Sequence, residues 1–122
     1  MILFNKNEYD CPVEVTLELI GGKWKSLILW HLSHRSLRFS ELRKAVPKAT
    51  QKMLTQQLRD LENNGLVSRK VYTQVPPRVE YSLTEFGKSI YPILEAMRNW
   101  GSEYLNNNIK DIPDNAASAG NE

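Results

Sequence analysis

The stretch from Thr50 to Gly65 constrains the fold more than any other part of the chain. Its apolar residues recur at helical spacing; they are Met53, Leu54, Leu58 and Leu61. Thr50 is a favoured helix N-cap, and Gly65 is a favoured residue just beyond a helix end. The sequence therefore predicts an amphipathic helix that starts after Thr50, stops at Gly65 and buries its apolar stripe.

A second helix and a hairpin are expected on either side of this helix. Ser40 should cap the helix SELRKAV, and Pro47 should end it, because the residue before a proline is pushed out of the helical region. The segment PKAT is then a short turn. After Gly65 the pattern favours two strands, 66–73 and 79–83, joined by the loop QVPPR. Helix, turn, helix and hairpin together predict a winged helix-turn-helix.

The flanking segments predict further helices. One helix should start at Cys11-Pro12 and end at Gly21, and a core helix should run over about 23–34. A long last helix, capped by Thr84, should be kinked or broken at Pro92. We expect an N-terminal arm (1–10), one domain (11–105) and a disordered tail (106–122). The expected fold class is mainly α with a small β-hairpin wing (α+β).

The last helix carries an apolar stripe that is long for a domain already supplied with three helices and a hairpin. The stripe comprises Phe86, Ile90, Ile93, Leu94, Met97, Trp100 and Tyr104. A helix-turn-helix typically binds palindromic DNA sites, which match the two-fold symmetry of a protein dimer. We therefore expect this helix, with the first helix and the arm, to form a homodimer interface. A helix folded back onto its own domain is the alternative.

Composition bounds the class of protein. At 122 residues, the chain suits one domain, and 41% hydrophobic with 25% charged residues is ordinary for a globular protein. No apolar run approaches the ~20 residues of a membrane span. The first ten residues lack the features of a signal peptide. A single cysteine, Cys11, excludes an intrachain disulfide. The expected location is the cytoplasm, with no membrane partner.

Charge is segregated along the chain. Ten basic and three acidic residues lie between Arg35 and Arg78, which gives this segment a charge of +7. Because the whole chain carries +2, the remainder carries −5. A basic middle between acidic ends is typical of a polyanion-binding surface. Chance clustering on a solvated surface is the alternative.

The polar face of the 50–65 helix contains the side-chain types that bind DNA. Glutamine can read adenine, and arginine or lysine can read guanine, through paired hydrogen bonds in the major groove. The residues expected to contact bases are Gln51, Lys52, Thr55, Gln56 and Arg59. Those expected to contact the DNA backbone, from the helices and the wing, are Ser40, Lys48, Arg69, Lys70 and Arg78. We expect Arg78, beside Pro77, to reach the minor groove.

Several motifs resemble one known family. They are CPVEVTLELIGGKW, LRFSELRKAV, QKMLTQQLRDLENNGLV, PPRVEYSLTEFG and IYPILEAMRNW. In order and spacing they are similar to the HxlR-type bacterial transcription regulators, winged-helix proteins related to MarR, over about 11–104. The resemblance implies a homodimer that binds double-stranded operator DNA. It also implies that some members respond to a small reactive or aromatic effector.

Cys11 is the regulatory candidate. At a helix start, the helix dipole would favour a thiolate, whereas the nearby acids Glu8, Asp10 and Glu14 would oppose it. The resemblance implies that an N-terminal cysteine can sense quinones, aldehydes or oxidants. Any disulfide would have to join Cys11 to its copy in the partner subunit or to a small thiol. A buried, apolar role for the cysteine is the alternative.

Other functions have less support in the sequence. It contains no nucleophile motif, no glycine-rich phosphate loop and no paired carboxylates in a plausible cleft, so we do not expect an enzyme or a cofactor. His31 and His34 lack further metal ligands, and packed or surface histidines are expected. The aromatic residues Trp24, Trp30, Trp100, Tyr91 and Tyr104 could line an effector pocket or simply form core. A winged helix that binds protein or RNA, without operator specificity, is the rival function.

Overall fold

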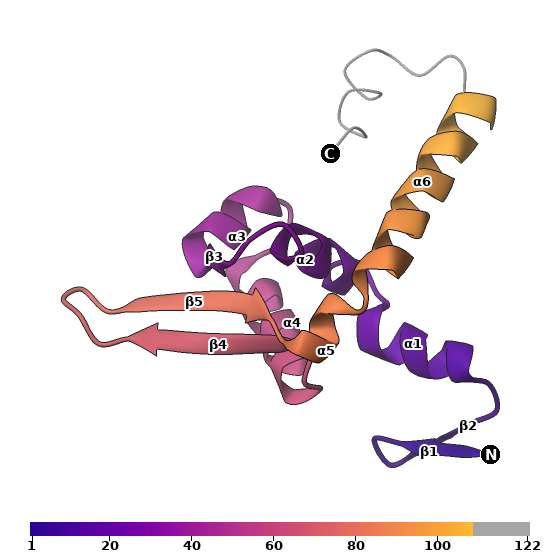
Figure 1. Ribbon diagram of the computed structural model, residues 1–122, viewed down its shortest axis with the longest axis horizontal. Coiled ribbons are helices and arrows are strands. Elements are labelled where there is room, and N and C mark those ends of the chain that lie inside the picture. The colour runs from indigo at the N-terminus through magenta and orange to yellow at the C-terminus, as the bar shows by residue number, and fades with distance from the viewer. Residues whose placement is uncertain (109–122) are drawn as a thin grey trace. The chain divides into compact units, whose positions relative to one another are not determined.

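The computed structural model describes residues 1–108, which include six helices and five strands (Figure 1). In chain order these are β1 (Ile2–Phe4), β2 (Asn7–Tyr9), α1 (Pro12–Ile20), α2 (Lys25–Leu32), β3 (Leu37–Arg38), α3 (Phe39–Ala45), α4 (Gln51–Asn63), β4 (Val67–Tyr72), β5 (Arg78–Leu83), α5 (Glu85–Lys88) and α6 (Tyr91–Asn108). The chain forms two compact units, one from Met1 to Ser89 and one that begins at Ile90. This is the expected α+β winged helix-turn-helix.

The core of the first unit is built from the inner faces of α2, α3 and α4 and from the root of the sheet. Its buried apolar residues are Ile20, Trp24, Ile28, Leu29, Leu32, Leu37, Leu42, Val46, Ala49, Leu54, Leu58, Leu61, Leu66 and Val67. In α2, Ile28 and Leu29 are fully buried, whereas Leu27 is exposed. The predicted stripe of α4 is correct at its three leucines, but Met53 is exposed.

The helix-turn-helix is fixed by local capping. Thr50 Oγ1 accepts a hydrogen bond from the Met53 N–H at 3.1 Å, which starts α4 at the expected place. Gly65 has a φ of +79°, a conformation that glycine adopts without steric cost, and it directs the chain from α4 into β4. The expected cap of α3 is wrong: Arg38 occupies the N-cap position, and Ser40 lies within the first turn.

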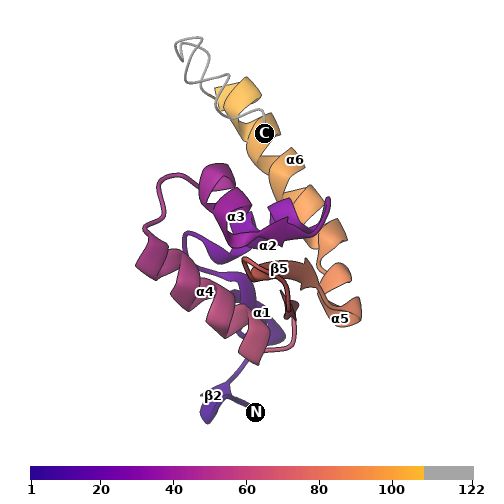
Figure 2. The same cartoon turned by 90° about the vertical axis from the view of Figure 1, so that its left-hand side faces the viewer.

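A three-stranded antiparallel sheet, ordered β3-β5-β4, carries the wing. In the long β4–β5 hairpin, Val67 pairs with Leu83 at the root and Tyr72 pairs with Arg78 near the tip. The short β3 pairs with β5 through Leu37–Tyr81 and Arg38–Glu80. Figure 1 shows the hairpin extending beyond α3 and α4, and Figure 2, seen from its tip, shows α3 and α4 joined by their short turn.

The expected N-terminal arm is a small hairpin. Asn5 and Lys6 both have positive φ, 51° and 64°, so a two-residue turn of type I′ joins β1 and β2. Tyr9 holds the hairpin against α1 by donating a hydrogen bond to Glu18 at 3.0 Å. Burial, followed by this hydrogen bond, raises the pKa of the Tyr9 phenol.

The expected single C-terminal helix is two helices, and the break precedes Pro92. Thr84 caps only the four-residue α5, and α6 begins at Tyr91. Pro92 is therefore in the first turn of α6, where its missing N–H leaves no hydrogen bond unmade. Helix α6 continues through Asn108, so 106–108 are not part of a tail; the rest of the expected tail lies outside the described residues. Across residues 1–108, no helix combines the length and apolar character needed to cross a membrane.

Candidate nucleic-acid interface

The outer face of α4 presents the polar side chains that the sequence indicated. Gln51, Lys52, Gln56 and Arg59 are exposed, while Thr55 is half-buried. The three buried leucines on the opposite face fix the rotation of the helix, so this polar face is directed away from the core. Met53 is exposed at the same end as Lys52, and an apolar side chain there can contact a thymine methyl group. Sequence periodicity had assigned Met53 to the core.

Gln56 is connected to the core by a short polar network. Its Nε2 donates a hydrogen bond to Asp60 Oδ1 at 3.1 Å, one turn further along α4. The other carboxylate oxygen, Oδ2, lies 3.5 Å from Nζ of Lys25 on α2, whose side chain is only 16% exposed. This network restrains the Gln56 amide, and Lys25 and Asp60 were not among the expected site residues.

The two faces of the wing differ in chemistry. Because side chains alternate along a strand, Arg69 and Lys70 lie on opposite faces. On one face, Arg69 lies opposite Tyr81, next to the Val71–Val79 pair. On the other, polar face, Lys70 lies opposite Glu80. Both cations are exposed. They therefore cannot approach one DNA strand in the same way, although the sequence had grouped them.

Arg78 is folded along the polar face of the wing. Its guanidinium carbon lies 4.2 Å from the centroid of the Tyr72 ring, and Nε lies 3.9 Å from Glu80 Oε2. The Tyr72 hydroxyl donates a hydrogen bond to Oε1 of the same carboxylate at 3.2 Å. Lys70 Nζ also lies 4.8 Å from the Tyr72 ring. The expected reach of Arg78 into a minor groove would require it to leave this stack.

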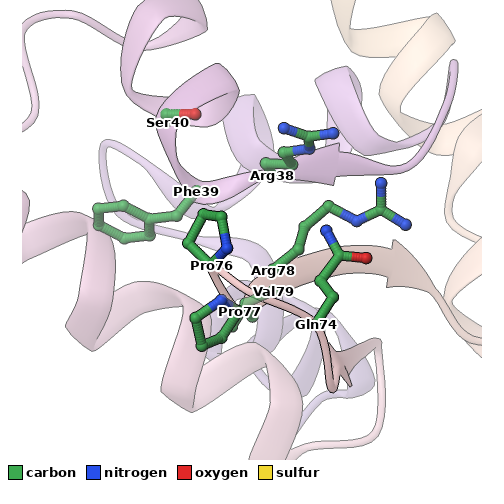
Figure 3. Close-up of a pocket in the computed structure, with 8 residues that line it drawn as sticks. All are labelled: Arg38, Phe39, Ser40, Gln74, Pro76, Pro77, Arg78 and Val79. Carbon is green, nitrogen blue, oxygen red and sulfur yellow. The ribbon is translucent and has the colours of Figure 1, made fainter.

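A hollow of about 300 Å³ lies between the wing tip and the start of α3 (Figure 3). It is lined by Arg38, Phe39, Ser40, Gln74, Pro76, Pro77, Arg78 and Val79. The hollow thus brings together two expected backbone contacts, Ser40 and Arg78, that are far apart in the sequence. It adds Arg38 and Gln74, which the sequence pattern did not single out. The pairing of β3 with β5 produces this proximity.

The start of α3 is held by Glu41. Its carboxylate accepts a hydrogen bond from the Arg38 N–H at 2.8 Å and lies 3.4 Å from the Arg35 guanidinium. The hydrogen bond from the Arg38 backbone, followed by the charge of Arg35, lowers the pKa of Glu41. This acid is therefore already paired within its own loop. Lys48, in the turn between α3 and α4, is exposed.

Cys11 is the N-cap of α1 and is exposed. Its N–H donates a hydrogen bond to Glu14 at 2.9 Å, as does the Asp10 N–H at 2.8 Å. Within a single chain, the Cys11 thiol is therefore not part of the core. No group of three or more His, Cys, Asp or Glu side chains that could hold a metal ion occurs among residues 1–108.

The apolar stripe expected at the dimer interface is divided by burial. Ile90 and Leu94 are buried. The exposed members are Phe86, Ile93, Met97, Trp100 and Tyr104. Within α6 the rings of Trp100 and Tyr104 stack with centroids 5.7 Å apart, although Trp100 is 70% exposed. Contiguous exposed apolar surface of this kind is typical of an interaction site.

Comparison with known proteins decides the family. Residues 19–109 match the HxlR-like helix-turn-helix family. The chain belongs to that family. It is 57% identical over 102 residues to YdeP, an HTH-type transcriptional regulator of Bacillus subtilis (strain 168), covering 83% of this chain and 80% of YdeP. An HTH-type regulator of Methanothermobacter thermautotrophicus is 58% identical over 98 residues, covering 80% and 75% of the two chains.

Solved structures of other regulators share the fold. The redox regulator HypR in its oxidised form superposes with a TM-score of 0.75 at 51% identity, covering 84% of this chain and all of HypR. The reduced form of the regulator YodB from B. subtilis gives 0.68 at 34% identity, covering 79% and 95%. The chain is thus a transcriptional regulator of the HxlR-like family and not an enzyme.

Proposed function

We propose that this HxlR-like regulator is a homodimer that binds a pseudo-palindromic operator, with α4 in the major groove. The exposed polar face of α4 carries this proposal, because it presents Gln51, Lys52, Gln56 and Arg59 over a fully buried leucine stripe. Glutamine and basic side chains on a helix of this length (13 residues, or ~20 Å) match the edge groups of bases in the major groove. Ser40, Lys48 and the wing cations would contact phosphates on either side.

The exposed side chains of α6 support the homodimer. Ile93, Met97, Trp100 and Tyr104 leave an apolar surface that a second copy would cover. Two copies would place two α4 helices on half-sites about one helical turn (~34 Å) apart. A monomer at micromolar concentration in analytical ultracentrifugation would contradict the dimer.

We further propose that oxidation of Cys11 changes DNA affinity. The exposed thiol supports this, as do the structures of two relatives: HypR, solved in oxidised and reduced forms, and YodB, solved after treatment with diamide. Since the chain has one cysteine, oxidation by diamide would join two Cys11 thiols into one S–S bond. The two electrons and two protons would pass to the N=N bond of diamide. Cys11→Ser should make DNA binding insensitive to diamide.

The deciding experiment is fluorescence anisotropy with the duplex upstream of the chain's own gene and with a scrambled duplex. A preference of about three decades or more for the natural duplex is expected of an operator-specific regulator. Equal affinity for both duplexes, or binding to neither, would favour the rival function in protein or RNA binding. The titration should be repeated across a salt series, because DNA affinities can be compared only at a stated salt concentration.

A further inference from the structure

The hollow beside the wing is lined by an arginine, Arg78, whose Nε has no hydrogen-bond partner. Among residues 1–108, Nε of Arg78 is the one buried side-chain nitrogen or oxygen that lacks a hydrogen-bond partner. Its distance of 3.9 Å from Glu80 is too long for a hydrogen bond. Because this nitrogen is itself shielded from solvent, an external acceptor would be bound by the rest of the guanidinium, whose charge Glu80 only partly offsets at this distance.

The remaining polar lining is also available. Within the described part of the chain, the Arg38 guanidinium and the Ser40 hydroxyl form no ion pair or side-chain hydrogen bond. Gln74 adds an amide, and no lining residue is acidic. Glu80, adjacent on β5, is offset by Arg38, Lys70 and Arg78, which leaves this end of the wing with a charge of +2.

The position of Arg78 is fixed before any ligand binds. The Tyr72 ring lies against its guanidinium at 4.2 Å, and the Tyr72 hydroxyl is itself bound to Glu80. Arginine held in this way loses little side-chain entropy on binding an oxyanion, and its planar fork matches phosphate geometry. Figure 3 shows Arg38 and Ser40 above the proline turn, with Gln74 and Arg78 entering from the hairpin.

We propose that this hollow is a seat for one phosphate group, bound by the Arg38 and Arg78 guanidiniums with hydrogen bonds from Ser40 and Gln74. The source that we favour is a backbone phosphate of the bound duplex, since the hollow lies between α3 and the wing; in this form the inference rests on the proposed function. In this role Arg78 holds a phosphate and does not read the minor groove. A free phosphorylated molecule offers the same chemistry.

The first test uses the full chain without DNA. Inorganic phosphate is titrated while the arginine Nε–H resonances are followed by ¹⁵N NMR, with Arg38→Gln supplying one assignment. We expect saturable shifts of Arg38 and Arg78 in the millimolar range, weakened in Ser40→Ala, a variant that removes one hydroxyl from a helical position. Arg69, on the other wing face, should not shift. Absence of saturation, or an equal shift of Arg69, would overturn the seat.

The second test identifies the source. Single methylphosphonates, which remove one backbone charge, are placed in turn along the operator. At one position per half-site, wild-type affinity should fall about tenfold, the loss expected for one charge-assisted contact. Arg38→Gln should weaken binding to the unmodified duplex and then tolerate that methylphosphonate without further loss. The control variant Lys70→Gln should also weaken binding, but its DNA affinity should still fall when the methylphosphonate is at that position.

The two tests fail separately. In one outcome, the loss of DNA affinity from Arg38→Gln and the loss from each methylphosphonate multiply, while inorganic phosphate still shifts the Arg78 resonance. This outcome refutes the DNA source, and the seat then serves a free phosphorylated molecule. If the chain binds no operator at all, the proposed function fails, and the phosphate titration still decides whether the seat exists.

Discussion

Nζ of Lys25 on α2 lies 3.5 Å from Oδ2 of Asp60 on α4, and Oδ1 of the same carboxylate accepts a hydrogen bond from Gln56. The polar face of α4 is thus connected to α2 through one acid. A glutamine that reads adenine uses Oε1 and one N–H, which leaves its second N–H for Asp60. We infer that Asp60 orients Gln56 for base reading.

Asp60→Ala should therefore reduce discrimination at the base pair read by Gln56, while Gln56→Ala should cost ~1–3 kcal/mol there. Measurement needs a duplex set substituted at each operator position. Glu62→Ala is the matched control, because it removes an exposed carboxylate from the same helix without a contact to Gln56. Equal base preferences in Asp60→Ala and Glu62→Ala would argue against an orienting role.

Lys25→Met should lower the free energy of unfolding by about 1 kcal/mol, between the values for exposed and buried ion pairs. The aliphatic part of the side chain is kept, so packing changes little. Urea denaturation of Lys25→Met, Asp60→Ala and the double variant gives the coupling energy. A coupling near zero would mean that the 3.5 Å contact adds no stability.

Thr50→Ala should destabilise the protein by about 1 kcal/mol, because the Met53 N–H loses its acceptor at the start of α4. Thr50→Ser keeps the acceptor and should retain most of the stability. Thr55→Ala makes the same chemical change inside α4 and should be neutral or slightly stabilising, since alanine has the higher helix propensity. Thermal denaturation at one fixed protein concentration separates the three. Equal losses in Thr50→Ala and Thr55→Ala would exclude capping as the cause.

Local features of the fold could be predicted from the sequence, because local chemistry determines them. The Thr50 cap, the stop at Gly65 and the buried Leu54 and Leu58 needed only neighbouring residues. Met53 could not be placed, since a residue at the edge of an apolar stripe is buried or exposed by its tertiary neighbours. The start of α3 was misplaced for a different, local reason: Glu41 accepts a hydrogen bond from the Arg38 N–H, so the helix is capped ahead of Ser40.

Features that depend on pairing across the chain were missed. The hollow requires Arg38 to lie beside the first residues of β5, which is a matter of strand register between segments some 40 residues apart. The N-terminal hairpin was missed because its turn, Asn5-Lys6, contains no glycine to indicate positive φ. The sequence indicated that Pro92 would kink or break the last helix. It did not show that Pro92 would lie in the first turn of a separate helix, α6.

Glu41 should make stability depend on pH in the acid range. Its pKa is lowered in the folded protein, first by the Arg38 N–H and then by Arg35, so the folded state favours the carboxylate. The resulting stabilisation is present above the ordinary carboxyl pKa of 4.5 and is lost as pH falls through the lower folded value. Glu41→Gln keeps an acceptor for the cap and should flatten this dependence. Urea midpoints between pH 3 and 6 that fall equally in both proteins would contradict the assignment.

Gly87 fixes α5 against the start of β4 and allows a matched comparison of two glycines. A Cβ at Gly87 would overlap the carbonyl of Leu66, which also accepts a hydrogen bond from the Thr84 N–H at 3.1 Å, so neither backbone segment can move freely. Gly87→Ala should therefore destabilise by about 1–3 kcal/mol. Gly101, inside α6, has nothing within 4 Å of the same position, and Gly101→Ala should stabilise by up to about 1 kcal/mol. Because alanine raises helix propensity at both sites, only the clash at Leu66 can give the two changes opposite signs. Urea unfolding at equal protein concentration measures both; changes of the same sign would show that α5 does not dock this closely.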